Sequence, residues 1–287
     1  MMGKYIQESE LINSSFDCFC INLATAGSLS DIGHISLKKL LKYFFLLKHI
    51  SNVVREIRPE LVYITPNAGG KAFFKDFIVV QILKCMGYKV IVHYHNKGVS
   101  AYQSKWVYNF FYKRFFSNLK VILLAENLYK DMAKYVKRED VYICPNGIPS
   151  SCKEEMEARR NNVIPHLLFL SNLLISKGVI VLLDALRILK EKGYLFNCQY
   201  VGGETAEINA MQFVVEVERR KLNDRVAYAG RKVGEEKNTF FQQADIFILP
   251  TMNECFPLVI LEAMEYKLPV ISTNEGGIPD IVKDGEN

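Results

Sequence analysis

The sequence predicts an α/β protein with two Rossmann-like, doubly wound domains that face a cleft. Short apolar, β-branched runs alternate with longer amphipathic segments along most of the 287 residues. Several of these runs are apolar almost throughout, which is typical of parallel strands covered on both faces. One polar stretch, PSSCKEEMEARRNNVIP at 149–165, interrupts the alternation. We therefore expect an N-terminal domain at 1–148 and a C-terminal domain at 149–287.

The expected strands are rich in valine, isoleucine, leucine and aromatic residues. They cover 16–24, 61–65, 89–95, 120–125, 141–145, 167–171, 196–202, 225–230, 245–250 and 269–273. The segments between them have helical periodicity. These helices lie near 36–57, 71–86, 101–117, 127–136, 177–192, 206–222, 234–243 and 257–266.

Composition limits the environment and the partners of this chain. The net charge of +5 suits an anionic small ligand, an anionic membrane surface or an ordinary soluble surface, and does not require nucleic acid as a partner. The seven cysteines form no C-x-x-C pair, and most lie in apolar runs, so we expect buried free thiols in a reducing compartment. No run approaches the ~18 apolar residues of a membrane span. A cytoplasmic location is expected.

The most informative segment is DIFILPTMNECFPLVILEAMEYKLPVISTNEGGIPDIV at 245–282. It begins as a buried strand, continues as a loop and then forms a helix that opens at Pro257. Open α/β sheets bind ligands at the carboxyl ends of their strands. A helix N-terminus at this edge offers free N–H groups and a favourable dipole to phosphate. The backbone at Phe256, Pro257 and Leu258 is therefore a predicted diphosphate site, although Pro257 has no N–H to donate.

Two carboxylates bracket this predicted phosphate site. Glu254 lies in the loop and Glu262 lies in the second turn of the helix. Because they are too far apart to share one helical face in register, we expect one to reach the sugar side and the other the ribose side of a nucleotide diphosphate. Carboxylates are well suited to accept hydrogen bonds from sugar hydroxyls.

The spacing of Glu254 and Glu262, followed by EGGIPDIV at 275–282, resembles the donor site of family 4 glycosyltransferases, which have the GT-B fold (glycosyl transferases group 1). Members in capsule, exopolysaccharide and lipopolysaccharide biosynthesis are the most similar. The resemblance implies a retaining, metal-independent enzyme without a cofactor. It would move a hexose-type sugar from a nucleotide-diphosphate sugar to a glycan or a lipid-linked glycan.

Further motifs extend the resemblance through the second half of the chain. The family pattern G-R-x-x-x-x-K-G corresponds to SNLLISKG at 171–178, where Lys177 matches and Asn172 replaces the arginine. The family's basic pair neutralises the departing diphosphate, which implies this role for Lys177. YAGRKVGEE at 228–236 implies that backbone near Lys232 and Val233 contacts the nucleobase.

The first half resembles the acceptor domain of the same family. VIVHYHNKG at 90–98 places His95 where members often carry a histidine that faces the transferred sugar. His93 lies on the same face of the expected strand. Either histidine could instead be a satisfied residue at a strand end, and a His-x-His metal pair is disfavoured because no acidic ligand follows nearby. No metal site is therefore expected.

A glycine-rich loop and an acidic residue complete the predicted acceptor site. Gly69 and Gly70 follow a strand and allow close approach of a ligand, but the turn itself explains them equally well. The loop lacks the G-x-G-x-x-G spacing of a dinucleotide site. Asp76 resembles an acidic residue of capsule and lipopolysaccharide glycosyltransferases.

The segment KWVYNFFYKRFF at 105–116 mixes aromatic and basic residues. It could rest on an anionic membrane that holds a lipid-linked acceptor, at the inner face of the cytoplasmic membrane. Packing in the core explains it equally well, and the same alternative applies to the helix that begins at Leu37.

The resemblance also implies that both ends fall short of the family pattern. The first strand of one domain, and the last strand and helices of the other, would be missing, which predicts low stability and weak activity. Together with Asn172, this favours an alternative function as a non-catalytic nucleotide-sugar-binding or partner subunit. The context of the two glutamates weighs against a sugar-nucleotide epimerase on the same fold.

Overall fold

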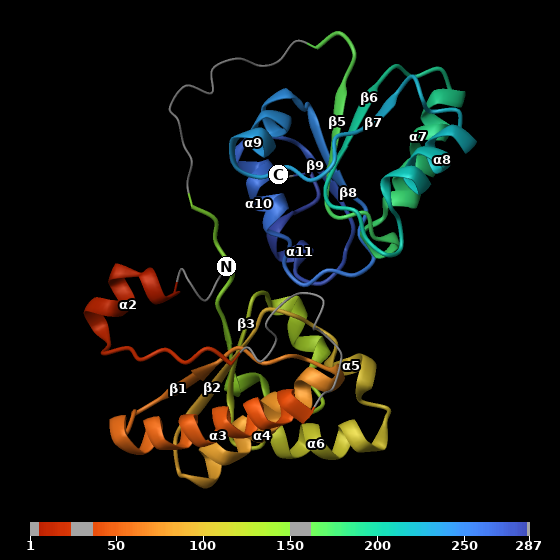
Figure 1. The fold of residues 1–287 in the computed structure, drawn as a ribbon. Coiled ribbons are helices and arrows are strands. Elements are labelled where there is room, and N and C mark those ends of the chain that lie inside the picture. Colours follow the sequence, from red (N-terminus) through yellow and green to blue (C-terminus); the bar gives the residue numbers. More distant parts are fainter. Residues whose placement is uncertain (1–5, 24–36, 150–161, 286–287) are drawn as a thin grey trace. The chain divides into compact units, whose positions relative to one another are not determined.

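A computed structural model describes residues 6–23, 37–149 and 162–285. The chain divides into two compact units, Met1–Leu123 with Tyr129–Tyr142, and Leu124–Leu128 with Ile143–Asn287 (Figure 1). The sequence predicted one boundary at 148/149. Most of the polar stretch that suggested it, 150–161 with Cys152, lies outside the described residues.

The sheet of the first unit has the strand order β1-β2-β3-β4. Its strands are β1 (Val62–Ile64), β2 (Val90–Tyr94), β3 (Lys120–Leu123) and β4 (Val141–Ile143). β2 pairs in parallel with β1 and with β3. Val92 and Val121 are paired in the register and are fully buried, which fits the apolar pattern of these strands.

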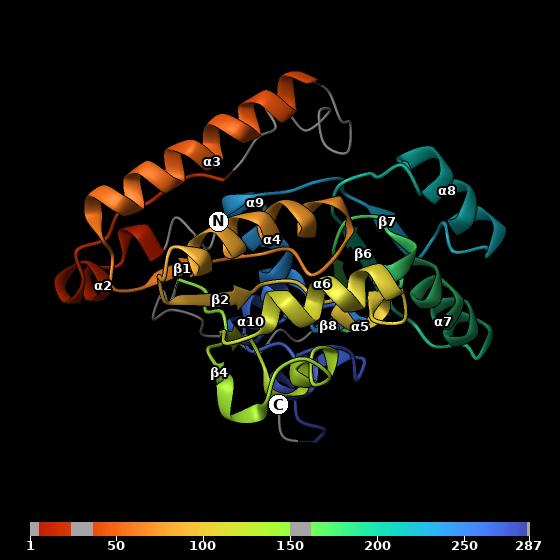
Figure 2. The same ribbon diagram turned by 90° about the horizontal axis from the view of Figure 1, so that it is seen from below.

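Helices of the first unit are α2 (Glu10–Ser15), α3 (Leu37–Ile57), α4 (Gly70–Cys85), α5 (Val99–Tyr102) and α6 (Trp106–Phe116). α4 and α6 lie side by side (Figure 2). The ring of Phe73 on α4 lies 4.6 Å from that of Tyr112 and 5.4 Å from that of Phe115, measured between centroids. These α6 aromatics are core residues, whereas Trp106 and Phe110 are 80% and 55% exposed.

Three local predictions for the first unit were wrong. Residues 16–23 form no strand, and Phe16 and Phe19 are exposed, because no described strand pairs with them. The single helix expected at 101–117 is divided by a turn into α5 and α6. The helix expected at 127–136 is a short 3₁₀ helix, η2 (Glu126–Asp131), followed by turns; a second, η3 (Arg138–Asp140), precedes β4.

The second unit contains a five-stranded sheet in the order β7-β6-β5-β8-β9, and all its pairs are parallel. The strands are β5 (His166–Leu170), β6 (Asn197–Val201), β7 (Val226–Tyr228), β8 (Ile246–Leu249) and β9 (Val270–Ser272). The strand order reverses at β5, between β6 and β8. Such a reversal opens a crevice at the carboxyl ends of the strands.

Helices cover both faces of this second sheet. α7 (Val179–Glu191) and α8 (Ala210–Arg219) lie on one face, and α9 (Gly234–Gln243) and α10 (Leu258–Glu265) lie on the other (Figure 1). The 3₁₀ turn η4 (Ile175–Lys177) precedes α7, and α11 (Ile278–Ile281) follows β9. Phe169, Tyr200, Phe213 and Phe247 fill the core between these layers. The predicted α/β class with two Rossmann-like parallel sheets is confirmed.

The cysteines of the described part of the chain are free thiols. Cys198 is buried in the core of the second unit, and burial raises the pKa of its thiol. The expectation that most cysteines are buried was wrong: Cys18, Cys20, Cys85 and Cys144 are exposed. Cys18 and Cys20 lie in the segment 16–23, which forms no strand, Cys85 ends α4, and Cys144 directly follows β4.

Candidate functional site

Two glycines shape the loop that follows β8. Gly276 has φ +56°, and a Cβ there would lie 2.1 Å from the backbone oxygen of Glu254. The N–H of Gly277 donates to the backbone oxygen of Cys255 at 2.7 Å. The backbone around Gly276 and Gly277 therefore packs directly against the backbone that carries Glu254.

The side chain of Glu254 forms an ion pair with Lys177, which lies at the end of η4. The Lys177 ammonium also donates to the backbone oxygen of Asn253 at 3.1 Å. The N–H of Cys255 donates to the other oxygen of the Glu254 carboxylate at 3.2 Å. Both charged side chains are mostly buried, with 21% exposure for Lys177 and 17% for Glu254.

Backbone contacts hold the loops after β5 and β8 together. The N–H of Met252 donates to the oxygen of Ser176 at 2.8 Å, and the buried hydroxyl of Thr251 donates to the same oxygen at 3.2 Å. Gly178 has φ +83°, and a Cβ there would lie 2.1 Å from the oxygen of Pro250. Glycine at this position lets the segment with Lys177 approach the end of β8.

Glu262 lies on α10 and pairs with Lys237 of α9 at 2.7 Å. Its side chain is 26% exposed and that of Lys237 is 23% exposed. Pro257 is the N-cap residue of α10, Leu258 is its first residue, and Phe256 is buried at 8% exposure. The start of α10 thus lies between two carboxylates, each of which is held by a lysine.

A pocket of about 490 Å³ lies at the carboxyl ends of β5, β6 and β7. Its lining residues are Asn172, Gly203, Glu204, Tyr228, Gly230 and Arg231. Asn172 Oδ1 accepts a hydrogen bond from the N–H of Gly203 at 3.1 Å. The hydroxyl of Tyr228 donates to the oxygen of Gly202 at 2.8 Å, and burial, together with the Glu204 charge, raises the pKa of Tyr228.

The predicted nucleobase contacts follow this pocket along the chain. Lys232 forms an ion pair with Glu236 at 3.4 Å, and Val233 is 64% exposed at the start of α9. Asn172, Lys177, Glu254 and the residues of the α10 start all lie in loops at the carboxyl ends of the strands of this sheet, or at the start of the helix that follows β8.

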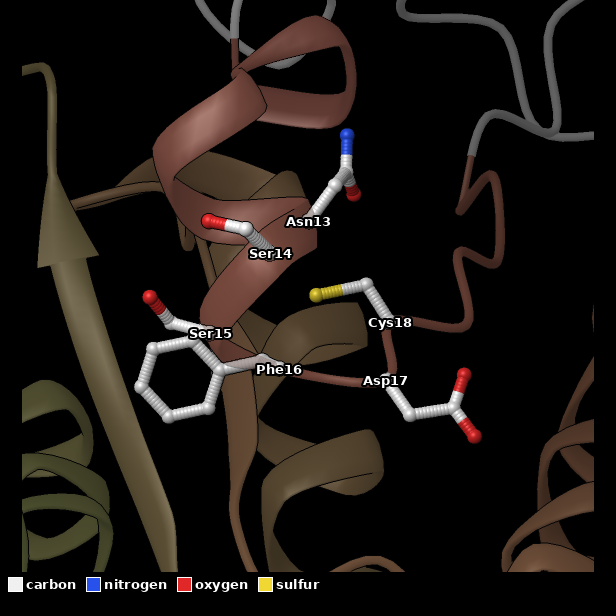
Figure 3. A pocket seen from close by; sticks show the side chains of 6 residues that line it. All are labelled: Asn13, Ser14, Ser15, Phe16, Asp17 and Cys18. Carbon is white, nitrogen blue, oxygen red and sulfur yellow. The ribbon is translucent and has the colours of Figure 1, made fainter.

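A further pocket of about 430 Å³ is lined by Asn13, Ser14, Ser15, Phe16, Asp17 and Cys18 (Figure 3). All six residues come from one continuous segment at the end of α2. The pocket shares no residue with the predicted site.

The predicted acceptor residues belong to the first unit. His93 is buried, its Nδ1 lies 2.6 Å from the Tyr63 hydroxyl oxygen, and its ring centroid lies 4.1 Å from that of His95. The two histidines are therefore side by side, with His95 directly after β2.

Asp76 and Gly69 have structural roles in the same unit. Asp76 Oδ2 accepts from both the backbone N–H and the side-chain amide of Asn67, each at 2.8 Å, and burial raises the pKa of the carboxyl. A Cβ on Gly69 would lie 2.3 Å from the Tyr102 ring, so this close packing accounts for Gly69. Gly70 begins α4 with φ +68°, a conformation that favours glycine.

Sequence reasoning missed three features of the second unit. Lys237 was part of an expected helix, but its partnership with Glu262 depends on how α9 and α10 pack. Arg231 lies directly after Gly230, and only the fold brings its side chain to Asn172 and Gly203. The buried hydroxyl of Thr251 likewise has no sequence pattern of its own.

No group of three or more histidine, cysteine, aspartate or glutamate side chains that could hold a metal ion occurs within the described ranges. None of the helices in those ranges is both long and apolar enough to cross a membrane.

Comparison with known proteins adds curated relatives. The amylovoran biosynthesis glycosyltransferase AmsK of Erwinia amylovora is 26% identical over 210 residues, which cover 70% of this chain and 51% of the relative. The putative teichuronic acid biosynthesis glycosyltransferase TuaC of Bacillus subtilis is 25% identical over 239 residues, which cover 79% of this chain and 56% of the relative. The chain thus spans about half the length of these relatives.

Solved structures of similar fold are also known. The apo form of the lipopolysaccharide outer core galactosyltransferase WaaB has a TM-score of 0.67 at 17% identity, over 88% of this chain and 66% of that one. Anabaena Alr3699/HepE in complex with UDP has a TM-score of 0.64 at 19% identity, over 84% and 66%. These likenesses confirm the GT-B fold class.

The family model "Glycosyl transferases group 1" matches residues 157–287. This range contains the loop with Glu254, the helix with Glu262 and the EGGIPDIV motif. The resemblance to glycosyltransferases of cell-surface polysaccharide synthesis is confirmed, and the second half of this chain is similar to the glycosyl transferases group 1 family.

Proposed function

We propose that this chain is a retaining glycosyltransferase of cell-surface polysaccharide synthesis. It takes a hexose-type sugar from a nucleotide-diphosphate sugar and transfers it to a glycan or a lipid-linked glycan. The observation that supports this most directly is the pair Glu254 and Glu262, which flanks the start of α10 at the carboxyl end of β8. The names of the relatives, which refer to amylovoran and teichuronic acid biosynthesis, support the pathway class.

The donor diphosphate would bind at the start of α10, where backbone N–H groups near Phe256 and Leu258 have no helical acceptor. Lys177 would stabilise the negative charge that develops on the diphosphate as the bond from the anomeric carbon to oxygen breaks. Its ion pair with Glu254 fixes the ammonium beside this helix start. The charge is thus supplied by protein groups, and we propose that no metal or cofactor takes part.

The two carboxylates would recognise the two sugars of the donor. Glu254 would accept hydrogen bonds from hydroxyls of the transferred sugar, and Glu262, held by Lys237, from the ribose hydroxyls. Asn172 and the backbone at Lys232 and Val233 would border the nucleotide.

In the first unit, His95 would contact the transferred sugar, and His93 would support the His95 ring from 4.1 Å away. Gly69, Gly70 and Asp76 would form or hold the acceptor side. The acceptor hydroxyl forms the new bond to the anomeric carbon on the face that the diphosphate leaves, and its proton goes to the departing phosphate oxygen.

The exposed rings of Trp106 and Phe110 lie on a helix that also carries Lys113 and Arg114. Aromatic and basic groups on one surface helix favour anionic bilayers. We propose peripheral contact with the inner face of the cytoplasmic membrane, where a lipid-linked acceptor is available.

The test measures nucleotide binding and turnover separately. UDP, GDP and ADP are titrated into the full chain by calorimetry, and donor cleavage is followed with the corresponding radiolabelled sugar nucleotides and a lipid-linked acceptor extract. Glu262→Ala should weaken binding of the preferred diphosphate about tenfold, because hydrogen bonds to a charged group contribute about 1.5–3 kcal/mol. Glu191→Ala, an exposed glutamate on α7, is the matched control and should leave affinity unchanged.

Equal affinity of the Glu262→Ala variant and the wild-type chain for the preferred nucleotide diphosphate would refute the assignment of Glu262 to the donor site. Binding of a nucleotide diphosphate without any transfer would favour the alternative, a non-catalytic nucleotide-sugar-binding or partner subunit.

A further inference from the structure

Arg231 is exposed and lines the pocket at the ends of β5, β6 and β7. A Cβ on Gly203 would lie 3.1 Å from Asn172 Oδ1 and 3.9 Å from Arg231 Cδ. Because Gly203 has no side chain, Asn172 and Arg231 approach the same point from the loops after β5 and β7. The three residues therefore form one wall of the 490 Å³ pocket.

Arg231 differs from the nearby lysines in its partners. Three lysines of this unit are each held by a glutamate, in the pairs Lys177–Glu254, Lys232–Glu236 and Lys237–Glu262. No hydrogen bond or ion pair joins Arg231 to another residue in the described parts of the chain. A guanidinium that lines a pocket without a protein partner is available to an anionic ligand.

The other polar groups of the pocket are already engaged or neutral. The Glu204 carboxylate accepts from the N–H of Ala210 at 2.8 Å, and Asn172 Oδ1 accepts from the N–H of Gly203. Asn172 carries no charge, although it occupies the position where the family pattern has an arginine. The pocket therefore has one cation, and it comes from the loop after β7.

We propose that Arg231 binds a phosphate group of the nucleotide donor and supplies the guanidinium that position 172 lacks. This inference rests on the proposed function and adds a binding residue to it. A planar guanidinium offers two parallel N–H donors to a phosphate, which a lysine cannot match. The donor phosphates would then lie between Arg231 and the start of α10, within the crevice of this one unit.

The experiment compares a diphosphate with its own nucleoside. UDP, GDP and ADP are titrated by calorimetry, and the preferred nucleotide is then paired with its nucleoside, whose weak binding is measured by ligand-observed NMR. Arg231→Ala should weaken diphosphate binding about tenfold or more and change nucleoside binding less than twofold, because the lost contact is charge-assisted. The diphosphate affinity of the wild-type chain should also fall more steeply with salt than that of the variant.

Arg187→Ala provides a charge-matched control on α7, where Arg187 pairs with Glu191 on the helix surface. It should leave both affinities unchanged, and circular dichroism should show both variants folded. Equal weakening of diphosphate and nucleoside in Arg231→Ala would place Arg231 at the base and overturn the proposal, as would no weakening. If the wild-type chain bound none of the three nucleotides, the proposed function itself would fail.

Discussion

Replacement of Gly276 by alanine should disrupt the loop that carries Glu254. The added Cβ would lie 2.1 Å from the backbone oxygen of Glu254 and 2.9 Å from that of Cys255. Both neighbours are backbone atoms, so rotation of a side chain cannot relieve the overlap. The loop after β8 must move instead, and with it the carboxylate that pairs with Lys177.

The expected cost has two parts. Alanine at φ +56° is disfavoured by roughly 1–2 kcal/mol because its Cβ approaches the following carbonyl oxygen. Overpacking against fixed neighbours adds about 1–3 kcal/mol. The sum is about 2–5 kcal/mol, a large share of the stability of a typical domain.

Gly234 separates these two contributions. It has the same φ of +56°, but no atom lies within 4 Å of its Cβ position, so Gly234→Ala should show only the backbone cost. Urea unfolding followed by circular dichroism gives both free energies of unfolding. Hydrogen exchange of residues 251–256 should increase in Gly276→Ala alone. The same unfolding midpoint for both variants, with unchanged exchange in this loop, would refute the close packing of Gly276 on Glu254.

Three further outcomes follow from charged contacts of the second unit. Lys177→Met should lower kcat about 10²–10³-fold while diphosphate affinity changes less, because the ammonium acts on charge that develops during transfer; steady-state kinetics measures this. Arg220→Ala should lower the free energy of unfolding by about 1–3 kcal/mol, since this buried guanidinium holds Asp184 at 2.7 Å and also pairs with Glu216. Arg220 holds the pKa of Asp184 below its ordinary value. The stabilisation from this pair is therefore fully present above about pH 4 and is lost as pH falls through the lowered pKa of Asp184. Urea unfolding midpoints measured across the acid range will show this loss.

Other results would contradict these predictions. A proportional loss of kcat and of diphosphate affinity in Lys177→Met would indicate that Lys177 acts in donor binding instead. The acid dependence should be weaker in Arg220→Ala than in the wild-type chain, and identical pH profiles would contradict the assigned cause.

The central strands β5 and β8 could be predicted closely because they are buried on both faces, which leaves apolar runs such as that of β8. The segment at 16–23 has a similar apolar character, but no strand among the described residues pairs with it, and a strand that lacks a partner cannot satisfy its backbone groups. Whether a partner exists depends on tertiary structure, which local pattern does not encode. The turn between α5 and α6 was missed for a related reason, since aromatic residues continue on both sides of it.

The candidate site was predictable where a motif joins residues that are close in the sequence. Glu254, the start of α10 and the two glycines that support the loop all fall within one short stretch. The partners of the carboxylates were not predictable, because Lys177 comes from the loop after β5 and Lys237 from α9. The position of Arg231 was not predictable for the same reason. Arg231 and Asn172 line one pocket only because β5, β6 and β7 are neighbours in the sheet.

One long-range contact of the second unit has a consequence for protein synthesis. The backbone N–H groups of Glu126 and Asn127 donate to the Asp280 carboxylate at 3.2 Å, and the Asn127 side chain donates to the oxygen of Gly276. These partners are separated by about 150 residues in the chain. At a translation rate of about 5–20 residues per second, the segment around Asn127 waits roughly 8–30 s on the ribosome before Asp280 is made. These backbone N–H groups must stay hydrated or held by a chaperone during that interval, so this contact of the second unit can form only after Asp280 has been translated.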